Sequence, residues 1–434
     1  MGYYCELMMG DYPISSDRNE VNPYIAALFD VDDLYIYRRK KGDRNKIVWG
    51  DIEDKEENEM CAVFRASADI IKDRLIVLGF SYQRGEDDFY SSIADRISML
   101  KQVFSGENNK RARSEISFLK KASYHTFFEA LIYIFENKIQ KKDLDNYKKN
   151  KNYKTLLYLF RNTNPFEDFP NSDARNVIRG LVEISPKNML LEYDITEHLY
   201  SQLYDDKFPK TKEIYRDLIL EDELPFEDRI NEKIIILTEG SSDANILKRS
   251  LRLLYPHLSK YYSFMDFDNA AVQGGSGSLA NNTKSFIGAG INNRIISLFD
   301  NDTAGYAATK QLSKLTIPEN FRILHLPDIE LASNYLTLGP TGLTHADINK
   351  CACSIELYFG KDVLMNNNDF YPIQWTGFEK GVGKYQGEII EKAAVQQRFN
   401  KKLGKCESDK KLILSHDWED MKKILQMIFS AFNE

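Results

Sequence analysis

Two similar stretches in the second half of the chain decide the predicted fold. They read Lys233-Ile-Ile-Ile-Leu-Thr-Glu239-Gly240-Ser-Ser-Asp243 and Arg294-Ile-Ile-Ser-Leu-Phe-Asp300-Asn301-Asp302-Thr-Ala-Gly305. In each stretch, a short apolar run ends in carboxylates and a glycine, and an amphipathic segment follows. A run of this kind, bounded by turn residues, is typical of a strand buried on both faces of a parallel sheet.

Further apolar runs continue this pattern between residue 233 and about residue 360. Tyr262–Phe267 and Phe321–Leu326 predict two more strands, and Ala307–Leu315 predicts the helix after the second acidic turn. Strands that alternate with helices at this spacing predict a doubly wound α/β sheet.

The acidic residues follow these strands directly. In open parallel sheets, ligands bind in the crevice at the carboxyl ends of the strands, so we expect Glu239, Asp300 and Asp302 to meet at one edge. Three uncompensated carboxylates repel one another unless a hard divalent cation lies between them. A single acidic turn also has an ordinary explanation as a helix cap, and for Asp243 that role is as good an explanation as catalysis. The combination nevertheless predicts a Mg²⁺ or Mn²⁺ site.

Composition sets the broad class. The 434 residues suffice for two or three domains with cores of their own. A net charge of -7 excludes a wholly basic nucleic-acid coat, but not a local basic groove. The five cysteines form no zinc spacing and no disulfide framework, which favours a reduced, cytoplasmic setting. We find no signal peptide and no apolar span of about 18 residues, and expect neither secretion nor membrane insertion.

The fold class that we predict is α+β, with several domains. Residues 1–50 predict short strands and turns, and helical periodicity follows from about residue 60 to residue 220, including one longer helix from Ile116 to Ile134. A charged, proline-punctuated segment at 205–229 predicts a boundary. We therefore expect a mostly helical domain at 1–228, an α/β domain at 229–360, and a C-terminal helical extension at 361–434 with helices at Tyr385–Phe399 and from Ser415.

The order of the acidic motifs resembles a known domain. An apolar strand with Glu-Gly-x-x-Asp, a glycine-rich middle, and an apolar strand with Asp-x-Asp-x-x-Gly is similar to the Toprim domain of topoisomerases, primases and overcoming-lysogeny-type nucleases. The resemblance covers about residues 233–360 and implies a Rossmann-like Toprim fold. It also implies that Glu239 is the catalytic glutamate, that Asp300 and Asp302 bind metal, and that Asp243 is the second acidic residue of the nuclease branch.

The N-terminal sequence resembles that of bacterial HEPN/Toprim-associated proteins. The similar parts are Met1-Gly-Tyr-Tyr-Cys, Gly10-Asp-Tyr-Pro13, Trp49-Gly50, Phe64, Arg74-Leu and Leu78-Gly-Phe80, with looser matches at Ser354–Gly360 and Tyr385–Phe399. This resemblance implies a role in phage or mobile-element conflict. A HEPN ribonuclease needs an Arg-x(4–6)-His pair on a helix, and only Arg252 and His257 have that spacing, inside the predicted Toprim helix. We therefore interpret the N-terminal domain as a non-catalytic scaffold, dimerisation or sensing module.

Other residues are candidates for supporting roles. Gly240 and the run Gly274-Gly275-Ser-Gly277 can cradle a phosphate through backbone N–H groups, although a flexible connection explains the run equally well. Glu356 can supply a further metal ligand, and Lys392 can stabilise charge in a transition state. The basic side chains that can hold a phosphate backbone are Lys284, Arg294, Arg398, Lys401 and Lys402.

Among the functions that this resemblance implies, hydrolysis fits the sequence best. No tyrosine is marked by its context as the nucleophile of a topoisomerase, and the cysteines form no primase-type zinc module. The leading hypothesis is a Mg²⁺-dependent nuclease acting on DNA or RNA. Its expected catalytic residues are Glu239, Asp300, Asp302 and Lys392, and its expected metal ligands are Glu239, Asp243, Asp300, Asp302 and Glu356. The alternative is a non-enzymatic regulator that senses a nucleotide or a protein. A homo-oligomer through the helical domain, and a phage or partner protein as a trigger, are further expectations.

Overall fold

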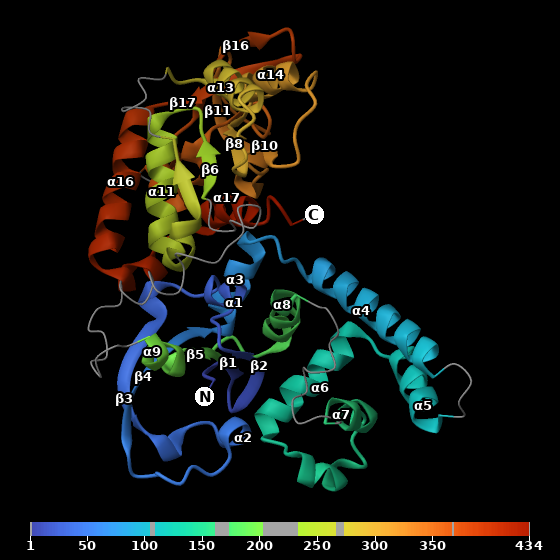
Figure 1. Cartoon of the computed structure of the whole chain (residues 1–434). Coiled ribbons are helices and arrows are strands. Elements are labelled where there is room, and N and C mark those ends of the chain that lie inside the picture. Colours follow the sequence, from blue (N-terminus) through green and yellow to red (C-terminus); the bar gives the residue numbers. More distant parts are fainter. Residues whose placement is uncertain are drawn as a thin grey trace. The chain divides into compact units, whose positions relative to one another are not determined.

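The computed structural model describes residues 2–104, 109–160, 173–202, 233–265, 273–366 and 369–433 (Figure 1). Contacts divide the chain into an N-terminal unit, Met1–Ile230 with Asn433, and a C-terminal unit, Asn231–Phe432 with Glu434. The mixture of helices and several sheets confirms the predicted α+β class. The predicted domain boundary between residues 228 and 229 lies outside the described residues. No helix in the described ranges combines the length and the apolarity that a membrane span needs.

A five-stranded sheet of order β2-β1-β5-β4-β3 organises the N-terminal unit. Phe64 and Tyr193 face each other across the β4–β5 pairing, and Phe29 packs against both rings. All three side chains are buried, so this face of the sheet carries part of the core. The strands are β1 Tyr4–Met9, β2 Tyr12–Arg18, β3 Leu34–Lys40, β4 Asn58–Ser67 and β5 Leu190–Asp194, and every neighbouring pair is antiparallel.

Helices make up the rest of this unit. Gly180 on α8 allows a close approach to α6, because a Cβ at this position would lie 2.4 Å from the ring of Phe128. The helices are α1 Pro23–Ala26, α2 Lys46–Trp49, α3 Ala68–Val77, α4 Tyr82–Val103, α5 Lys110–Leu119, α6 Tyr124–Asn137, α7 Tyr153–Leu159, α8 Ala174–Ile184 and α9 Thr196–Gln202.

The single long helix predicted from Ile116 to Ile134 is wrong. α5 ends at Leu119, and α6 begins after Ser123, whose hydroxyl accepts the backbone N–H of Thr126 at 3.3 Å. An N-cap of this kind satisfies a free N–H group at the helix start, so it allows a new helix to begin here. The apolar residues keep helical spacing through both helices, so their periodicity could not predict the break between them.

A parallel sheet of order β10-β8-β6-β7 organises the C-terminal unit. Its strands are β6 Ile234–Leu237, β7 Tyr262–Phe264, β8 Ile295–Phe299 and β10 Phe321–His325, at the four predicted places. The helices α11 Ser241–Leu254, α13 Ser276–Gly288 and α14 Thr303–Leu312 follow β6, β7 and β8 along the chain. Apolar residues of β6, β8 and β10 pack with α13 and α14 in one buried cluster. The sheet therefore fixes where each strand ends.

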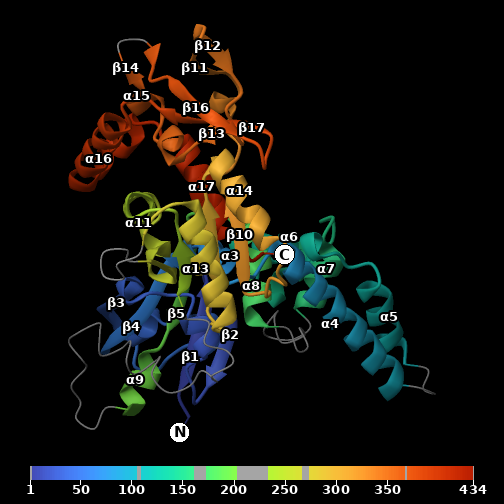
Figure 2. The ribbon, with the colours of Figure 1, turned by 90° about the horizontal axis from the view of Figure 1, so that it is seen from above.

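A second, mixed sheet has the order β12-β11-β16-β17. Its strands are β11 Tyr335–Gly339, β12 Gly342–Ala346, β16 Ile373–Glu379 and β17 Lys384–Ile389. β11 and β16 are parallel, and the other neighbours are antiparallel (Figure 2). Two short strand pairs join β9 Asn301–Asp302 to β13 Ala352–Cys353, and β14 Met365–Asn366 to β15 Asp369–Phe370. The remaining helices are α15 Lys361–Leu364, α16 Lys392–Ser408 and α17 Glu419–Phe429.

The tail differs from the predicted helical extension. It contains β16 and β17 as well as helices, and its residues belong to the same contact unit as the parallel sheet. The helix predicted at Tyr385–Phe399 begins only at Lys392, because the residues before it pair with β16. The last helix begins at Glu419 instead of Ser415, and the carboxylate of Asp417 accepts the N–H of Glu419 at 3.1 Å. Strand pairing between distant residues overrides local helical periodicity here.

Candidate active site at the carboxyl ends of β6 and β8

Parallel pairing brings the two acidic turns together. Leu237 of β6 lies opposite Ser297 of β8, so the turns that follow these strands begin at the same edge of the sheet. The Glu239 carboxylate accepts the backbone N–H of Asp300, with 3.0 Å between Oε1 and N. Glu239 therefore points toward the second acidic turn. The sequence hypothesis requires more, namely that the carboxylates of Glu239, Asp300 and Asp302 share one ion, and this bond reaches only the backbone of Asp300.

Asp302 has two relations to its surroundings. It caps α14, because its Oδ1 accepts the N–H of Gly305 at 2.7 Å. It also pairs with Ala352 of β13, which brings the segment around residue 352 to this edge. Asp302 therefore acts as a helix cap, the ordinary explanation of an acidic turn, and this cap holds its carboxylate at the edge of the sheet.

Gly305 is required by the backbone around Asp300. A Cβ at residue 305 would lie 2.5 Å from the carbonyl oxygen of Asp300, which is a backbone atom that cannot move aside alone. The glycine of the Asp-x-Asp-x-x-Gly motif therefore allows α14 to begin directly against the acidic turn.

We expect Gly305→Ala to destabilise the protein by about 1–3 kcal/mol, the usual cost of forcing an extra carbon into a packed position. The matched control is Gly404→Ala in α16, where a Cβ would meet no atom within 4 Å. That change should stabilise the protein by about 0.5–1 kcal/mol, because alanine favours a helix interior over glycine. Urea unfolding measures both variants, and equal effects would contradict this explanation of Gly305.

The glycine-rich run packs against the first acidic turn. The N–H of Gly275 donates to the carbonyl oxygen of Glu239 at 2.7 Å, and Gly275 has a φ of 104°, in the left-handed region that favours glycine. A Cβ on Gly274 would lie 3.1 Å from the same carbonyl oxygen. Gly240 precedes α11, and Gly277 lies in the first turn of α13 instead of the predicted loop. The N–H of Gly275 is thus engaged within the protein, and phosphate binding by the other three glycines stays a prediction.

Two further predicted residues reach this region from distant parts of the sequence. Glu356, in the 3₁₀ helix Ile355–Tyr358, is fully buried and accepts hydrogen bonds from Ser354 at 2.6 Å and Gln396 at 2.7 Å. The Lys392 ammonium, in the first turn of α16, lies 3.4 Å from the Glu356 Oε1 atom. Glu356 therefore connects Lys392 to the protein interior.

These side chains influence one another electrostatically, and we name the acidic ones together the acidic cluster: Glu239, Asp243, Asp300, Asp302 and Glu356. Burial raises the pKa of Glu239 to about 7, and the nearby charges of Asp302 and Asp243 add to this shift. The pKa of Asp243 rises to about 6, first through burial and then through Glu356. Burial and the same neighbours hold the pKa of Asp300 well above its ordinary range. Such shifts are typical of functional sites.

Among the described residues, Lys392 is a cation that faces the cluster. Burial by itself lowers the pKa of Lys392, but the carboxylates of Glu356, Asp300 and Asp243 outweigh this effect and raise it. In return, the Lys392 charge opposes the upward shifts in the pKa of Glu239 and of Asp302, which burial still raises overall. The raised pKa values of Glu239, Asp243 and Asp300 show that Lys392 does not compensate the cluster fully.

The side chains fit a hard cation by their chemistry, but their placement is not that of a finished metal site. Across the described ranges, no three His, Cys, Asp or Glu side chains are grouped closely enough to hold a metal ion. The electrostatic coupling is compatible with this finding, because charges interact over longer distances than the roughly 2 Å of Mg²⁺ coordination. Carboxylate oxygens are the donors that Mg²⁺ prefers. Rotation of side chains would be needed to bring three of them onto one ion.

His325 is a neighbour of the cluster that the sequence hypothesis missed. It ends β10, directly opposite Phe299 of β8. Its Nδ1 lies 3.0 Å from the carbonyl oxygen of Asp300, its Nε2 lies 3.1 Å from the Thr309 hydroxyl, and its ring stacks on Tyr306 at 4.0 Å. Burial lowers the pKa of His325, which favours the neutral ring. The sequence carried little signal for it, because His325 lies inside the strand predicted at Phe321–Leu326, whereas Asp300 follows its strand directly.

Several basic residues proposed to hold phosphate are engaged inside the protein. Lys402 is buried, and its ammonium donates to the Phe359 carbonyl at 2.8 Å, to Asp362 at 2.9 Å and to the Asp417 carbonyl. Arg398 donates to the Asp362 carbonyl at 3.2 Å, and the Arg294 guanidinium lies over the ring of Phe432. Lys402 is thus a structural cation and not a phosphate ligand, which corrects the sequence-based hypothesis.

Comparison with known proteins identifies the N-terminal half. Residues 1–218 match a family described as HEPN/Toprim N-terminal domain 1, which is half of the 434-residue chain. The chain belongs to this family. No curated protein and no solved structure gives a significant match. The matched HEPN/Toprim N-terminal domain ends before β6, so the acidic cluster lies in the part of the chain beyond the match.

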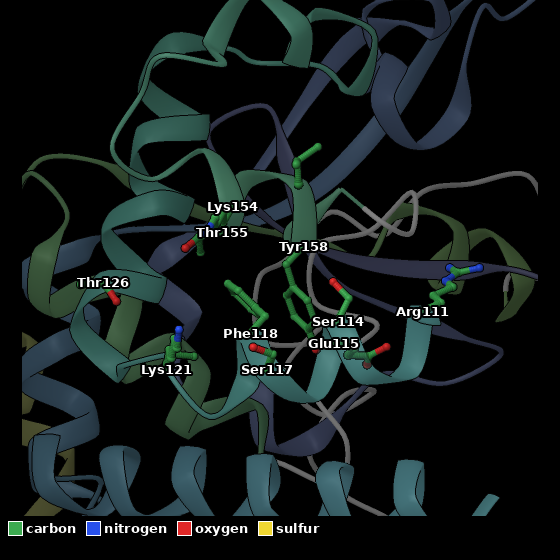
Figure 3. A pocket seen from close by; sticks show the side chains of 12 residues that line it. Arg111, Ser114, Glu115, Ser117, Phe118, Lys121, Thr126, Lys154, Thr155 and Tyr158 are labelled. Atoms are coloured by element: carbon green, nitrogen blue, oxygen red, sulfur yellow. The ribbon is translucent and has the colours of Figure 1, made fainter. Parts of the chain in front are cut away.

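The HEPN/Toprim N-terminal domain contains a cavity of about 690 Å³ between α5, α6 and α7 (Figure 3). The rings of Phe118 and Tyr158 stack at 4.6 Å in its wall, and Arg111, Lys121 and Lys154 make it basic. Among the described residues that line it, the acidic one is Glu115, which is paired with Arg96 at 3.1 Å. None of the predicted site residues lines this cavity.

A second cavity in the HEPN/Toprim N-terminal domain, of about 730 Å³, lies over the polar face of its sheet. Glu6 and Asp194, which pair across β1 and β5, both line it. Glu6 is 4% exposed, and its Oε2 accepts the indole N–H of Trp49 at 2.9 Å. Its other oxygen, Oε1, is buried and accepts no hydrogen bond from the described residues. Burial raises the pKa of Glu6 to about 7.

Proposed function

We propose that the chain is a divalent-metal-dependent nuclease that hydrolyses phosphodiester bonds of DNA or RNA. The observation that carries this proposal is the hydrogen bond from the Asp300 N–H to the Glu239 carboxylate at 3.0 Å, at the carboxyl edge of a parallel sheet. Ligands bind at that edge in sheets of this kind. The family to which the chain belongs carries both HEPN and Toprim in its name, and these names support a nuclease-type role.

We infer that the parallel sheet is a Toprim-type, Rossmann-like sheet. Helices follow three of its four strands along the chain, and acidic residues follow β6 and β8 in the order Glu-Gly-x-x-Asp and Asp-x-Asp-x-x-Gly. The close approach at Gly305 supplies a physical reason for the last glycine of this pattern.

Within this proposal, Glu239, Asp300 and Asp302 would hold Mg²⁺ or Mn²⁺, with Asp243 beside them. Such an ion stabilises charge on phosphoryl oxygens and makes water a nucleophile near neutral pH. Glu239 serves in this proposal either as a metal ligand or as the acceptor of the proton from the attacking water.

Lys392 is suited to stabilise negative charge on the phosphoryl group, because it faces the same cluster from α16. Glu356 was predicted as a metal ligand, but Ser354, Gln396 and Lys392 already contact its two oxygens. We therefore propose Glu356 as a positioning residue for Lys392.

The rival is a non-enzymatic regulator that binds a nucleotide or a protein at the acidic cluster. One observation favours it, namely that the described residues include no three potential ligands grouped for a metal. In either case we place the protein in the cytoplasm and in phage or mobile-element conflict. A homo-oligomer through the helices of the N-terminal unit, and a phage or partner protein as a trigger, belong to the same proposal.

The deciding experiment incubates the purified chain with single-stranded and double-stranded DNA and RNA, in Mg²⁺, in Mn²⁺ and in EDTA. We expect cleavage with either metal and none in EDTA. Isothermal titration with nucleotides tests the rival, which requires binding without turnover. Equal products with metal and with EDTA would rule out a metal-dependent nuclease.

A further inference from the structure

The β16–β17 hairpin exposes aromatic side chains to solvent. Phe378 and Tyr385 face each other across the hairpin, are 53% and 60% exposed, and have ring centroids 5.1 Å apart. The ring of Trp375 lies 6.0 Å from that of Tyr385, and it covers Gly387, where a Cβ would come within 3.1 Å of the indole. We name Trp375, Phe378 and Tyr385 the aromatic strip. Two exposed rings beside a third, partly buried one are a candidate binding surface.

The aromatic strip is attached to the acidic edge of the parallel sheet. The hydroxyl of Thr303, the residue after Asp302, donates to the Tyr385 carbonyl at 2.8 Å. The Lys310 ammonium, on α14, donates to the carbonyl of Gly381 in the hairpin turn at 3.1 Å. Two residues of α14 therefore bind the hairpin. Through Thr303, one hydrogen bond connects the backbone of the aromatic strip to the residue that follows Asp302.

Lysines border the aromatic strip. Lys380 and Lys384 lie in and beside the hairpin turn, and Lys310 reaches the same turn from α14. Within the described part of the chain, none of the three forms an ion pair, but Lys384 lies opposite Glu379 and its charge lowers the pKa of Asp328. Successive residues of a strand point to opposite faces, so Lys384 faces away from Tyr385. Lys310 and Lys380 therefore supply the positive charge near the aromatic strip.

Unpaired bases and phosphates together match this surface. Bases of a single strand stack on aromatic side chains, while lysines follow the backbone, and neither contact depends on base sequence. In a duplex the base faces are covered by their neighbours, so the rings would have no partner. A purely apolar protein partner would not need the lysines.

We infer that the aromatic strip and its lysines bind single-stranded nucleic acid. The unpaired bases stack on Phe378 and Tyr385, and the backbone continues toward the acidic cluster. This inference rests on the proposed function, because it takes the bound strand to be the substrate of the nuclease. It names the substrate class as strands with unpaired bases.

The test measures fluorescence anisotropy with labelled DNA and RNA single strands of about 12 nucleotides, a length within the usual range for such surfaces. An Asp300→Asn background prevents cleavage during the measurement. We expect Phe378→Ala and Tyr385→Ala each to weaken binding about tenfold, since one stacked base contributes on that order. Phe378→Trp should retain binding. The matched control is Leu343→Ala, which removes a side chain 61% exposed on β12 of the same sheet and should change nothing.

A salt titration tests the lysines separately. Each phosphate contact to a single strand contributes about 0.7 to the slope of log K against log salt. The Lys380→Gln variant should therefore reduce that slope by about 0.7. An unchanged slope would show that Lys380 makes no contact with the phosphate backbone.

The outcomes separate this inference from the proposed function. Binding that is lost in the aromatic variants, together with a wild-type chain that cleaves no strand in Mg²⁺ or Mn²⁺, would overturn the proposed nuclease and retain the single-strand binding surface. If the wild-type chain cleaves but the aromatic variants bind as tightly as the parent protein, the proposed binding surface would be overturned and the nuclease function would remain. Duplex binding as tight as single-strand binding, or no binding to any strand, would also overturn it.

Discussion

An Asp300→Asn variant is expected to lose cleavage by about 1,000-fold while it remains at least as stable as the wild type. Loss of one charged metal ligand removes several kcal/mol of transition-state stabilisation, and about 1.4 kcal/mol corresponds to a factor of ten. The same change removes a buried carboxylate whose pKa is held well above its ordinary range by burial and by its acidic neighbours. Loss of activity together with retained stability would exclude simple misfolding.

The sign of the pH effect follows from that shift. Folding raises the pKa of Asp300, so the native state binds its proton more tightly than the unfolded chain does. The contribution of Asp300 to stability is therefore present below the unfolded pKa of about 3.9, and it is lost as pH rises toward the folded value. Asp300→Asn should consequently raise the Tm most at alkaline pH.

Added Mg²⁺ provides an independent readout. A ligand that binds only the native state at 100 times its Kd stabilises it by about 2.7 kcal/mol. We expect Mg²⁺ to raise the Tm of the wild type and not that of Asp300→Asn. Glu319→Gln, which changes an exposed carboxylate before β10 in the same unit, should respond like the wild type. If both variants cleave as the wild type does, Asp300 takes no part in the reaction.

The second large effect concerns the N-terminal unit, where Glu6→Gln is expected to stabilise the protein at pH 8. The pKa of Glu6 is raised from 4.5 to about 7, first by burial and further by Asp194 and Glu197, while Trp49 and Arg44 oppose the shift. The native state therefore binds more protons than the unfolded state between pH 4.5 and about 7, and stability falls as pH rises through that window. Glutamine keeps the shape and never ionises. It should add about 1–3 kcal/mol at pH 8 and almost nothing at pH 4.

Chemical denaturation across this pH range measures the effect. The control is Glu56→Gln on the same unit, since Glu56 is 85% exposed and a surface ion pair contributes little. A constant difference between wild type and Glu6→Gln at every pH would show that Glu6 does not titrate in this window. The result is independent of the acidic cluster, because Glu6 belongs to the other unit.

The sequence alone determined the parallel sheet and its acidic turns. Ile234–Leu237 and Ile295–Phe299 are almost wholly apolar, and the abrupt change to Glu239 and to Asp300 marks where each strand ends. Because parallel strands end at one edge, the order of these residues in the sequence sufficed to predict that the two turns meet, and a 3.0 Å hydrogen bond joins the Glu239 carboxylate to the backbone N–H of Asp300. Whether they bind a metal stays a prediction.

Only the tertiary structure decided the remaining neighbours of that edge. Glu356 and Lys392 reach it from segments more than 50 residues beyond Asp300, and no local periodicity records such an approach. The β16–β17 hairpin occupies part of a predicted helix, because pairing between strands satisfies backbone groups that a helix would otherwise satisfy internally. For the basic residues, too, the sequence could not predict which side chains are buried. Lys402 and Lys380 look alike in sequence, but packing buries the first among carbonyl oxygens and leaves the second exposed beside the aromatic strip.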